Sequence, residues 1–164
     1  MPCRPARRRR KGDEIGTRPG AQRVPNTASL TLETVEGHGL RFRVRVGGGQ
    51  EMLLDSGAGR SALNPIETLL AALGGCEGMD VIEILRKKRQ QVSGYEVTLT
   101  GERRAEHPRS YTRIELVHRV RGRDLSPAAI EEAILLSETK YCSVHASLSK
   151  EIEIVSRYEI VPDP

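Results

Sequence analysis

The chain has 164 residues and a hydrophobic content of 37%, which suits one domain with a buried core but is low for a globular protein. Much of the deficit lies in residues 1–26, which carry eight Lys/Arg and two Asp/Glu, so the rest of the chain has a formal net charge of −2. No apolar run is long enough to span a membrane, none of secretory type follows the arginines, and the scattered four Tyr and one Phe give no stacking platform for single-stranded nucleic acid.

Residues 1–26 form a basic segment without apolar periodicity, and we expect a disordered tail there. A run of arginines is typical of segments that bind nucleic acid or a membrane surface, so binding of nucleic acid through residues 4–11 is a minor alternative. The simpler interpretation is a solvated N-terminus. We therefore expect neither nucleic acid nor a membrane as a partner.

Three short segments after the tail alternate apolar and polar residues, as half-buried strands do. We predict strands at residues 28–35, 40–47 and 51–55. In the second of these, apolar side chains point to one face and Arg41, Arg43 and Arg45 to the other.

A long helix is predicted from Pro65 for about 25 residues. Asn64 suits the N-cap, Pro65 the first helical position, and Glu67 the third position, where a carboxylate completes a capping box. An apolar row at helical spacing follows: Ile66, Leu69, Leu70, Leu73, Cys76, Val81, Ile82 and Leu85. The cations of "RKKRQ" lie at the C-terminal end, where the helix dipole favours them.

Three glycines interrupt this helix around a cysteine, in "GGCEG". Each glycine costs about 1 kcal/mol relative to alanine inside a helix. We expect Gly74, Gly75 and Gly78 to permit the close approach of another helix.

The second half of the chain alternates between strands and helices. We predict strands at residues 95–104 and 110–122, a helix at 124–141 with Ser126 as its N-cap, a short helix at 142–150, and a closing strand at 151–161. The order β-β-β-α-β-β-α-α-β predicts an α+β domain whose helices cover the apolar faces of its sheets.

The chain has three cysteines, of which Cys3 lies in the tail. Cys76 and Cys142 are 66 residues apart, with no spacing typical of zinc sites, and we expect neither a metal nor a cofactor. Without a secretory signal we expect the cytoplasm, where paired cysteines are more often free, catalytic or redox-active than structural. Residue chemistry alone leaves two inert thiols and a redox pair equally open.

Four stretches of the chain resemble the OsmC/Ohr superfamily of peroxide-reducing proteins, and most closely its YhfA-like branch. They are "NPIETLLAALGGCEGMDVIEILRKKRQ", "VTLTGERR", "GRDLSPAAIEEAILLSETKYCSVHASL" and "SRYEIV". The two cysteine contexts, in their order and spacing, are the specific part of the resemblance. It runs from about residue 29 to residue 161, so we assign residues 27–164 to one OsmC-like domain.

The resemblance implies antiparallel sheets wrapped around central helices in an intertwined homodimer, with sites at the dimer interface. It implies that Cys76 attacks the O–O bond of a hydroperoxide and becomes a sulfenic acid. Cys142 then condenses with it to a disulfide, which a small thiol or dithiol reduces. In such a dimer the glycines near Cys76 would face the partner's central helix.

Two features depart from the pattern of the organic-hydroperoxide members. Their catalytic Glu directly follows the Pro that begins the helix, where this chain has Ile66, and the nearest carboxylate is Glu67. Glu67 lies nine positions before Cys76, about half a turn out of phase, so capping is its alternative role. Arg41 and Arg43 lie in the region that supplies an arginine in the family, but neither can be matched to it.

Polar residues near the cysteines are further candidates. Cys76, Asp80 and Glu83 lie on one line of the helix, either as a polar strip or with Asp80 sharing an arginine with the thiol. His145 follows Cys142 by one turn and could act as an acid or base.

We predict a homodimer that reduces organic hydroperoxides with a thiol or dithiol reductant, with Cys76, Cys142 and Glu67 as candidate catalytic residues. The alternative is a non-catalytic protein that binds a small ligand on the same scaffold.

Overall fold

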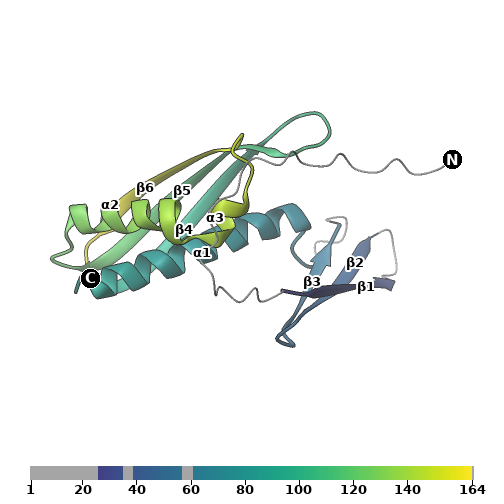
Figure 1. Ribbon diagram of the computed structural model, residues 1–164, viewed down its shortest axis with the longest axis horizontal. Helices are drawn as coiled ribbons and strands as arrows, with labels where there is room; N and C mark the ends of the chain where they lie inside the picture. The colour runs from purple at the N-terminus through teal and green to yellow at the C-terminus, as the bar shows by residue number, and fades with distance from the viewer. Residues whose placement is uncertain (1–25, 35–38, 57–60, 164) are drawn as a thin grey trace, which may run out of the picture.

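The computed structural model describes residues 26–34, 39–56 and 61–163 (Figure 1). Its strands are β1 (Ala28–Thr34), β2 (Leu40–Val46), β3 (Glu51–Asp55), β4 (Gln91–Arg103), β5 (Tyr111–Arg123) and β6 (Glu153–Val161). Its helices are α1 (Pro65–Lys87), α2 (Pro127–Leu136), the π-helical turn η1 (Ser137–Tyr141) and α3 (Ser143–Ser147). The predicted basic tail lies outside the described residues, except for Asn26.

The predicted α+β class and the predicted order of elements are confirmed. The Asn64 side chain accepts hydrogen bonds from the backbone N–H groups of Ile66 and Glu67, and the Glu67 carboxylate accepts one from Asn64 N. This capping box fixes the start of α1 where it was predicted. The second predicted helix is shorter than expected, because its last turn widens into η1 just before Cys142.

Two three-stranded sheets form the β structure. The N-terminal sheet has the order β1-β2-β3 with antiparallel pairs, and the second sheet has the order β4-β5-β6. The second sheet is mixed and not purely antiparallel as predicted, because β6 runs parallel to β5. The cause is the helical connection through α2, η1 and α3, which returns the chain to the end of the sheet where β5 began.

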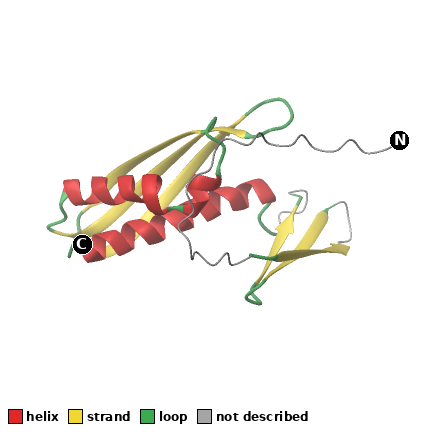
Figure 2. Ribbon diagram, viewed as in Figure 1, coloured by secondary structure: helices red, strands yellow, loops and turns green. Residues whose placement is uncertain are grey.

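The helices cover one face of the second sheet (Figure 2). One buried cluster joins α1, α2 and β5 through Val81, Leu85, Val120 and Ile130, and a second cluster includes Leu73, Tyr111, Ile114, Leu116 and Cys142. The N-terminal sheet lies beside the first turns of α1 (Figure 1). Helix α1 packs on the second sheet, and a bridge between Leu54 and Leu63 connects the N-terminal sheet to the segment just before the helix.

Two of the three glycines of α1 face strand β4 of the same chain and not another helix. A Cβ atom on Gly74 would lie 2.5 Å from Leu99 Cδ1, and one on Gly78 would lie 3.1 Å from the Tyr95 ring. Only at Gly75, of the three, would it meet nothing within 4 Å. The expected close approach is therefore real, but at Gly74 and Gly78 the neighbour is a strand.

Among the described residues, no helix is both long enough and apolar enough to cross a membrane.

Substitution of the two adjacent glycines tests this packing. Gly74→Ala should lower the free energy of unfolding, since overpacking costs about 1–3 kcal/mol and exceeds the gain in helix propensity of about 1 kcal/mol. Gly75→Ala is the matched control and should lower the free energy of unfolding by less than Gly74→Ala does, because within the chain its new methyl group meets no atom within 4 Å. Urea unfolding of both variants at one protein concentration measures the difference. Equal stabilities would contradict the packing of Gly74 on Leu99.

Candidate functional site

Two thiols from distant parts of the chain lie together in the structure. Cys76, in the middle of α1, is partly exposed, whereas Cys142 is 3% exposed. Their sulfur atoms lie within 4.8 Å of each other. Both are free thiols. The expectation that the fold brings Cys142 to Cys76 is confirmed, and Cys3 lies outside the described residues.

Backbone hydrogen bonds hold Cys142 between η1 and α3. Its N–H donates to the Ser137 carbonyl at 2.9 Å, which closes the π-helical turn. Its sulfur accepts the backbone N–H of His145 at 3.3 Å, as an N-cap side chain does. Cys142 is thus the point at which the chain leaves η1 and begins α3.

Asp80 is the third group at the sulfurs. One of its carboxylate oxygens lies within 4.8 Å of both sulfur atoms. Its Oδ2 accepts a hydrogen bond from Ser137 Oγ at 3.0 Å. The hydrogen-bond partner of Asp80 is therefore a serine and not the arginine that the sequence suggested. Glu83 forms an ion pair with Lys87.

A buried carboxylate follows Cys76 directly. Glu77 is 0% exposed, and its Oε1 lies 2.8 Å from His145 Nδ1. Burial raises the pKa of Glu77, and the hydrogen bond from His145 partly opposes that shift. The predicted acid–base candidate His145 is therefore tied to α1, and Glu77 is a residue that sequence reasoning missed.

Behind Glu77 lies a second buried histidine. His118 of β5 is 0% exposed, and its Nδ1 lies 2.6 Å from the Tyr95 hydroxyl. Its Nε2 lies 4.0 Å from Glu77 Oε2, and neither of these atoms has a hydrogen-bond partner among the described residues. Burial lowers the pKa of His118 to about 4, so this imidazole is neutral at physiological pH.

The electrostatics around Cys142 favour the protonated thiol. Burial raises its pKa to about 12, and the neighbouring Cys76 side chain and the charge of Glu77 act in the same direction. The N–H group of His145 opposes this shift by donating to the sulfur. Cys142 therefore keeps its proton at neutral pH while Cys76, which is more accessible, lies at the open side of the pair.

The other predicted site residues are engaged elsewhere. Glu67 is exposed and completes the capping box of α1. Arg41 and Arg43 both bind the carboxylate of Glu33, and Arg43 also binds Glu51. Glu67 thus stabilises the start of α1, and the two arginines form ion pairs with neighbouring strands of the N-terminal sheet.

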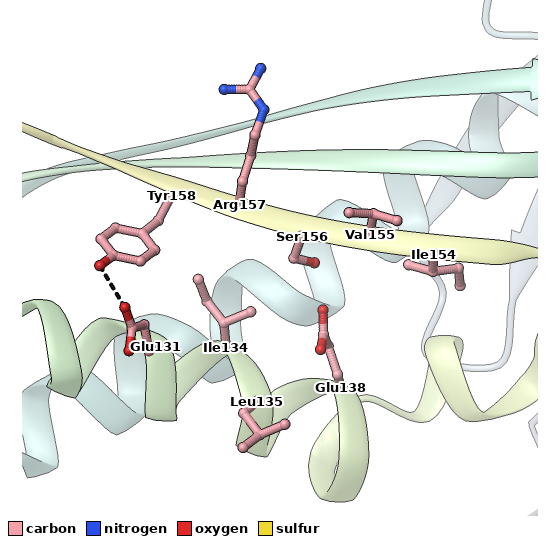
Figure 3. A pocket seen from close by; sticks show the side chains of 9 residues that line it. All are labelled: Glu131, Ile134, Leu135, Glu138, Ile154, Val155, Ser156, Arg157 and Tyr158. Atoms are coloured by element: carbon pink, nitrogen blue, oxygen red, sulfur yellow. Dashed lines mark hydrogen bonds between the residues drawn. The ribbon is translucent and has the colours of Figure 1, made fainter.

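A separate groove of about 730 Å³ runs between α2, η1 and β6 (Figure 3). Ser156 and Tyr158 point toward the helices, Arg157 points away, and the Tyr158 hydroxyl donates to Glu131 at 2.8 Å (Figure 3). No cysteine lines this groove. The groove is therefore separate from the pair formed by Cys76 and Cys142.

Comparison with known proteins gives consistent matches. The sequence model of the OsmC-like protein family matches residues 57–157. Protein YhfA of Escherichia coli K12 is 46% identical over 123 residues, which cover 75% of this chain and 92% of that protein. A hypothetical protein from Aquifex aeolicus VF5 has a crystal structure that is 33% identical, with a TM-score of 0.70 over 85% of this chain and 99% of that one. The organic hydroperoxide resistance protein OhrB of Bacillus subtilis shares the fold at 14% identity, with a TM-score of 0.55 over 81% and 98% of the two chains.

The neutral state of buried His118 can be measured directly. Its pKa falls from 6.5 to about 4 on folding, so protons bind the unfolded chain more readily. The contribution of His118 to the free energy of unfolding is therefore complete above pH 6.5. It is lost as pH falls toward 4, by up to about 3 kcal/mol.

Imidazole NMR signals should place the His118 midpoint near pH 4, and a midpoint near 6.5 would contradict its burial as a neutral group. The raised pKa of Glu77 acts in the opposite sense as pH rises above 4.5. For that reason, the pH dependence of the free energy of unfolding is measured as the difference between wild type and His118→Gln.

Proposed function

Because the chain belongs to the OsmC-like protein family, we propose that it reduces organic hydroperoxides through a redox pair formed by Cys76 and Cys142. The observation that carries this proposal is the proximity of two free thiols, whose sulfur atoms lie within 4.8 Å although the residues are 66 positions apart in the sequence. The fold it shares with the organic hydroperoxide resistance protein OhrB adds support. A reducing compartment such as the cytoplasm would supply the thiol reductant.

The difference in exposure assigns the two roles. Reactive cysteines are partly exposed and structural ones are buried, so Cys76 is the residue that meets the peroxide. Its thiolate attacks one peroxide oxygen, an S–O bond forms, and the O–O bond breaks. The alkoxide leaves as an alcohol after taking one proton, and Cys76 is left as a sulfenic acid.

Cys142 then resolves the sulfenic acid. Its sulfur attacks the sulfur of Cys76, the S–S bond forms, and the hydroxyl group leaves as water with the proton of the Cys142 thiol. The N–H group of His145, which already donates to this sulfur, stabilises the negative charge that develops there. A small thiol or dithiol reduces the disulfide by exchange and restores both thiols.

Glu77 acts as a positioning residue in this scheme. Its Oε1 accepts the hydrogen bond from His145 Nδ1, which fixes the orientation of the ring and ties α3 to α1. Since Cys142 begins α3, the same bond keeps its sulfur beside Cys76. Glu67 is a helix cap in this scheme and has no chemical step.

A non-catalytic ligand-binding protein remains the second candidate, favoured by the engagement of Arg41 and Arg43 with Glu33. That function needs no activated thiol. It predicts that Cys76 alkylates as slowly as a free cysteine in a peptide and that peroxide leaves both thiols reduced.

Measurement of alkyl hydroperoxide consumption, with a dithiol as reductant, separates the two candidates. Cys76→Ser should lower the rate by at least about 100-fold, since a serine hydroxyl is not ionised at neutral pH and cannot replace the thiolate. Cys142→Ser should still react once and should accumulate a sulfenic acid that a dimedone probe labels. Cys3→Ser is the control and should keep the wild-type rate.

A Cys76→Ser variant that consumes peroxide at the wild-type rate would overturn the proposed function. Comparison of an alkyl hydroperoxide with hydrogen peroxide in the same assay identifies the preferred substrate.

The proposal includes a homodimer built along α1. Met79 is 76% exposed, and beside it an open hollow of about 570 Å³ is lined mainly by apolar groups of α1 and β4. Gly75 lies in the same hollow, with free space where a Cβ atom would be. An exposed apolar surface of this kind is a feature of protein interfaces. In a symmetric dimer, the α1 helices of two identical chains would pack against each other across this surface.

Sedimentation equilibrium tests the dimer. Wild-type protein should have twice the mass of one chain, and Met79→Glu should weaken association by at least about tenfold, because it places a charge in an apolar interface. Leu135→Glu is the matched control, a similar change at an exposed apolar side chain of α2, and should leave the mass unchanged. A wild-type monomer would contradict this part of the proposal.

A further inference from the structure

Three potential metal ligands meet at the proposed redox site. The sulfur atoms of Cys76 and Cys142 and one carboxylate oxygen of Asp80 all lie within 4.8 Å of one another. In a tetrahedral zinc site, ligand atoms are separated by about 3.5–3.8 Å, as follows from Zn–S bonds of about 2.3 Å and Zn–O bonds of about 2.0 Å. Small side-chain rotations would bring ligand atoms that lie up to 4.8 Å apart to these separations. We propose that the reduced chain binds one zinc ion through Cys76, Asp80 and Cys142, with a fourth position open to water.

The spacing in the sequence hides this site. Cys76 and Asp80 are four residues apart on one helix face, a spacing that lets two side chains reach the same ion. The third ligand comes from the junction of η1 and α3, 66 residues further along. Because no motif joins the three, the sequence alone predicts no metal, and only the fold brings them together.

The ligand set selects for the chemical class of the ion. Two thiolates and one carboxylate suit zinc, which accepts sulfur, nitrogen and oxygen ligands, and they do not suit magnesium or calcium, which require oxygen ligands. Three protein ligands with one open position are the arrangement of exchangeable or catalytic zinc sites, whereas structural sites have four.

Outer contacts already hold two of the three ligands. Ser137 Oγ donates to Asp80 Oδ2 at 3.0 Å, and the backbone N–H of His145 donates to Cys142 Sγ at 3.3 Å. Hydrogen bonds of this kind orient metal ligands and tune their donor strength. Ser137 is buried and also accepts the N–H of Cys142 through its carbonyl, so one residue supports two of the ligands.

The charge of the site also favours a cation. Asp80 lies beside both sulfur atoms and Glu77 directly follows Cys76, so acidic side chains flank the two thiols. A divalent ion reverses this field: it binds both sulfurs as thiolates, and two protons leave to solvent without any change of oxidation state.

Zinc binding and peroxide reduction would use the same two thiols and therefore exclude each other. The zinc form would protect Cys76 and Cys142 from oxidation, and the disulfide form has no thiolate to offer a metal. The ion would thus regulate the proposed peroxide chemistry without taking part in it.

Titration of the untagged, reduced, metal-free chain with zinc against a chromophoric chelator tests the site. We expect one ion per chain, and we expect Cys142→Ser and Asp80→Asn each to weaken binding by at least about tenfold. Cobalt should give thiolate charge-transfer absorption in the near ultraviolet, which Cys76→Ser and Cys142→Ser should reduce. Matched controls are Glu83→Gln, an exposed carboxylate on the same helix, and Cys3→Ser; both should bind zinc as wild type does.

Absence of binding, or equal binding by wild type and Cys142→Ser, would overturn the zinc site. Peroxide consumption measured with excess chelator is independent of these results. A failure of zinc binding therefore does not contradict the proposed reductase activity. Absence of reductase activity likewise does not affect the zinc stoichiometry, which is measured separately.

Discussion

The hydrogen bond between Glu77 and His145 is the constraint on which the arrangement of the thiols depends. Helix α3 has five residues and none of them is fully buried, so the packing of Val144 on the core holds it only in part. The contact of 2.8 Å with a fully buried carboxylate ties it to α1. A buried carboxylate without a partner is strongly destabilising, so the folded chain keeps this bond and with it the position of Cys142.

The glycines of α1 make room for this buried network. Gly78 lets the Tyr95 ring of β4 approach the helix, and the Tyr95 hydroxyl in turn contacts His118 beside Glu77. A side chain at Gly78 would push the ring away from the helix. The loss of helix propensity at "GGCEG" is thus offset by close packing of α1 on its own sheet, directly behind Cys76.

Local signals predicted the elements well, because caps and alternation are encoded within a few residues. Asn64 and Ser126 marked two helix starts, and the order of strands and helices followed from periodicity. Glu77 escaped prediction, although it sits four residues from both Leu73 and Val81 on the buried row. A charged residue on an apolar row was the available signal. Three other features depend on contacts between distant parts of the chain, which no local pattern records. They are the pairing of Glu77 with His145, the parallel pairing of β6 and the packing of a strand on Gly74.

The two sulfurs at the end of this network are the centre of the functional account. Their separation is short enough for direct bonding after a small movement, and one is accessible while the other is buried. The most direct test is a peptide map of the full chain after one equivalent of an alkyl hydroperoxide. The account predicts one new cross-link, a disulfide between Cys76 and Cys142. Two unmodified thiols, or a cross-link that instead involves Cys3, would contradict it.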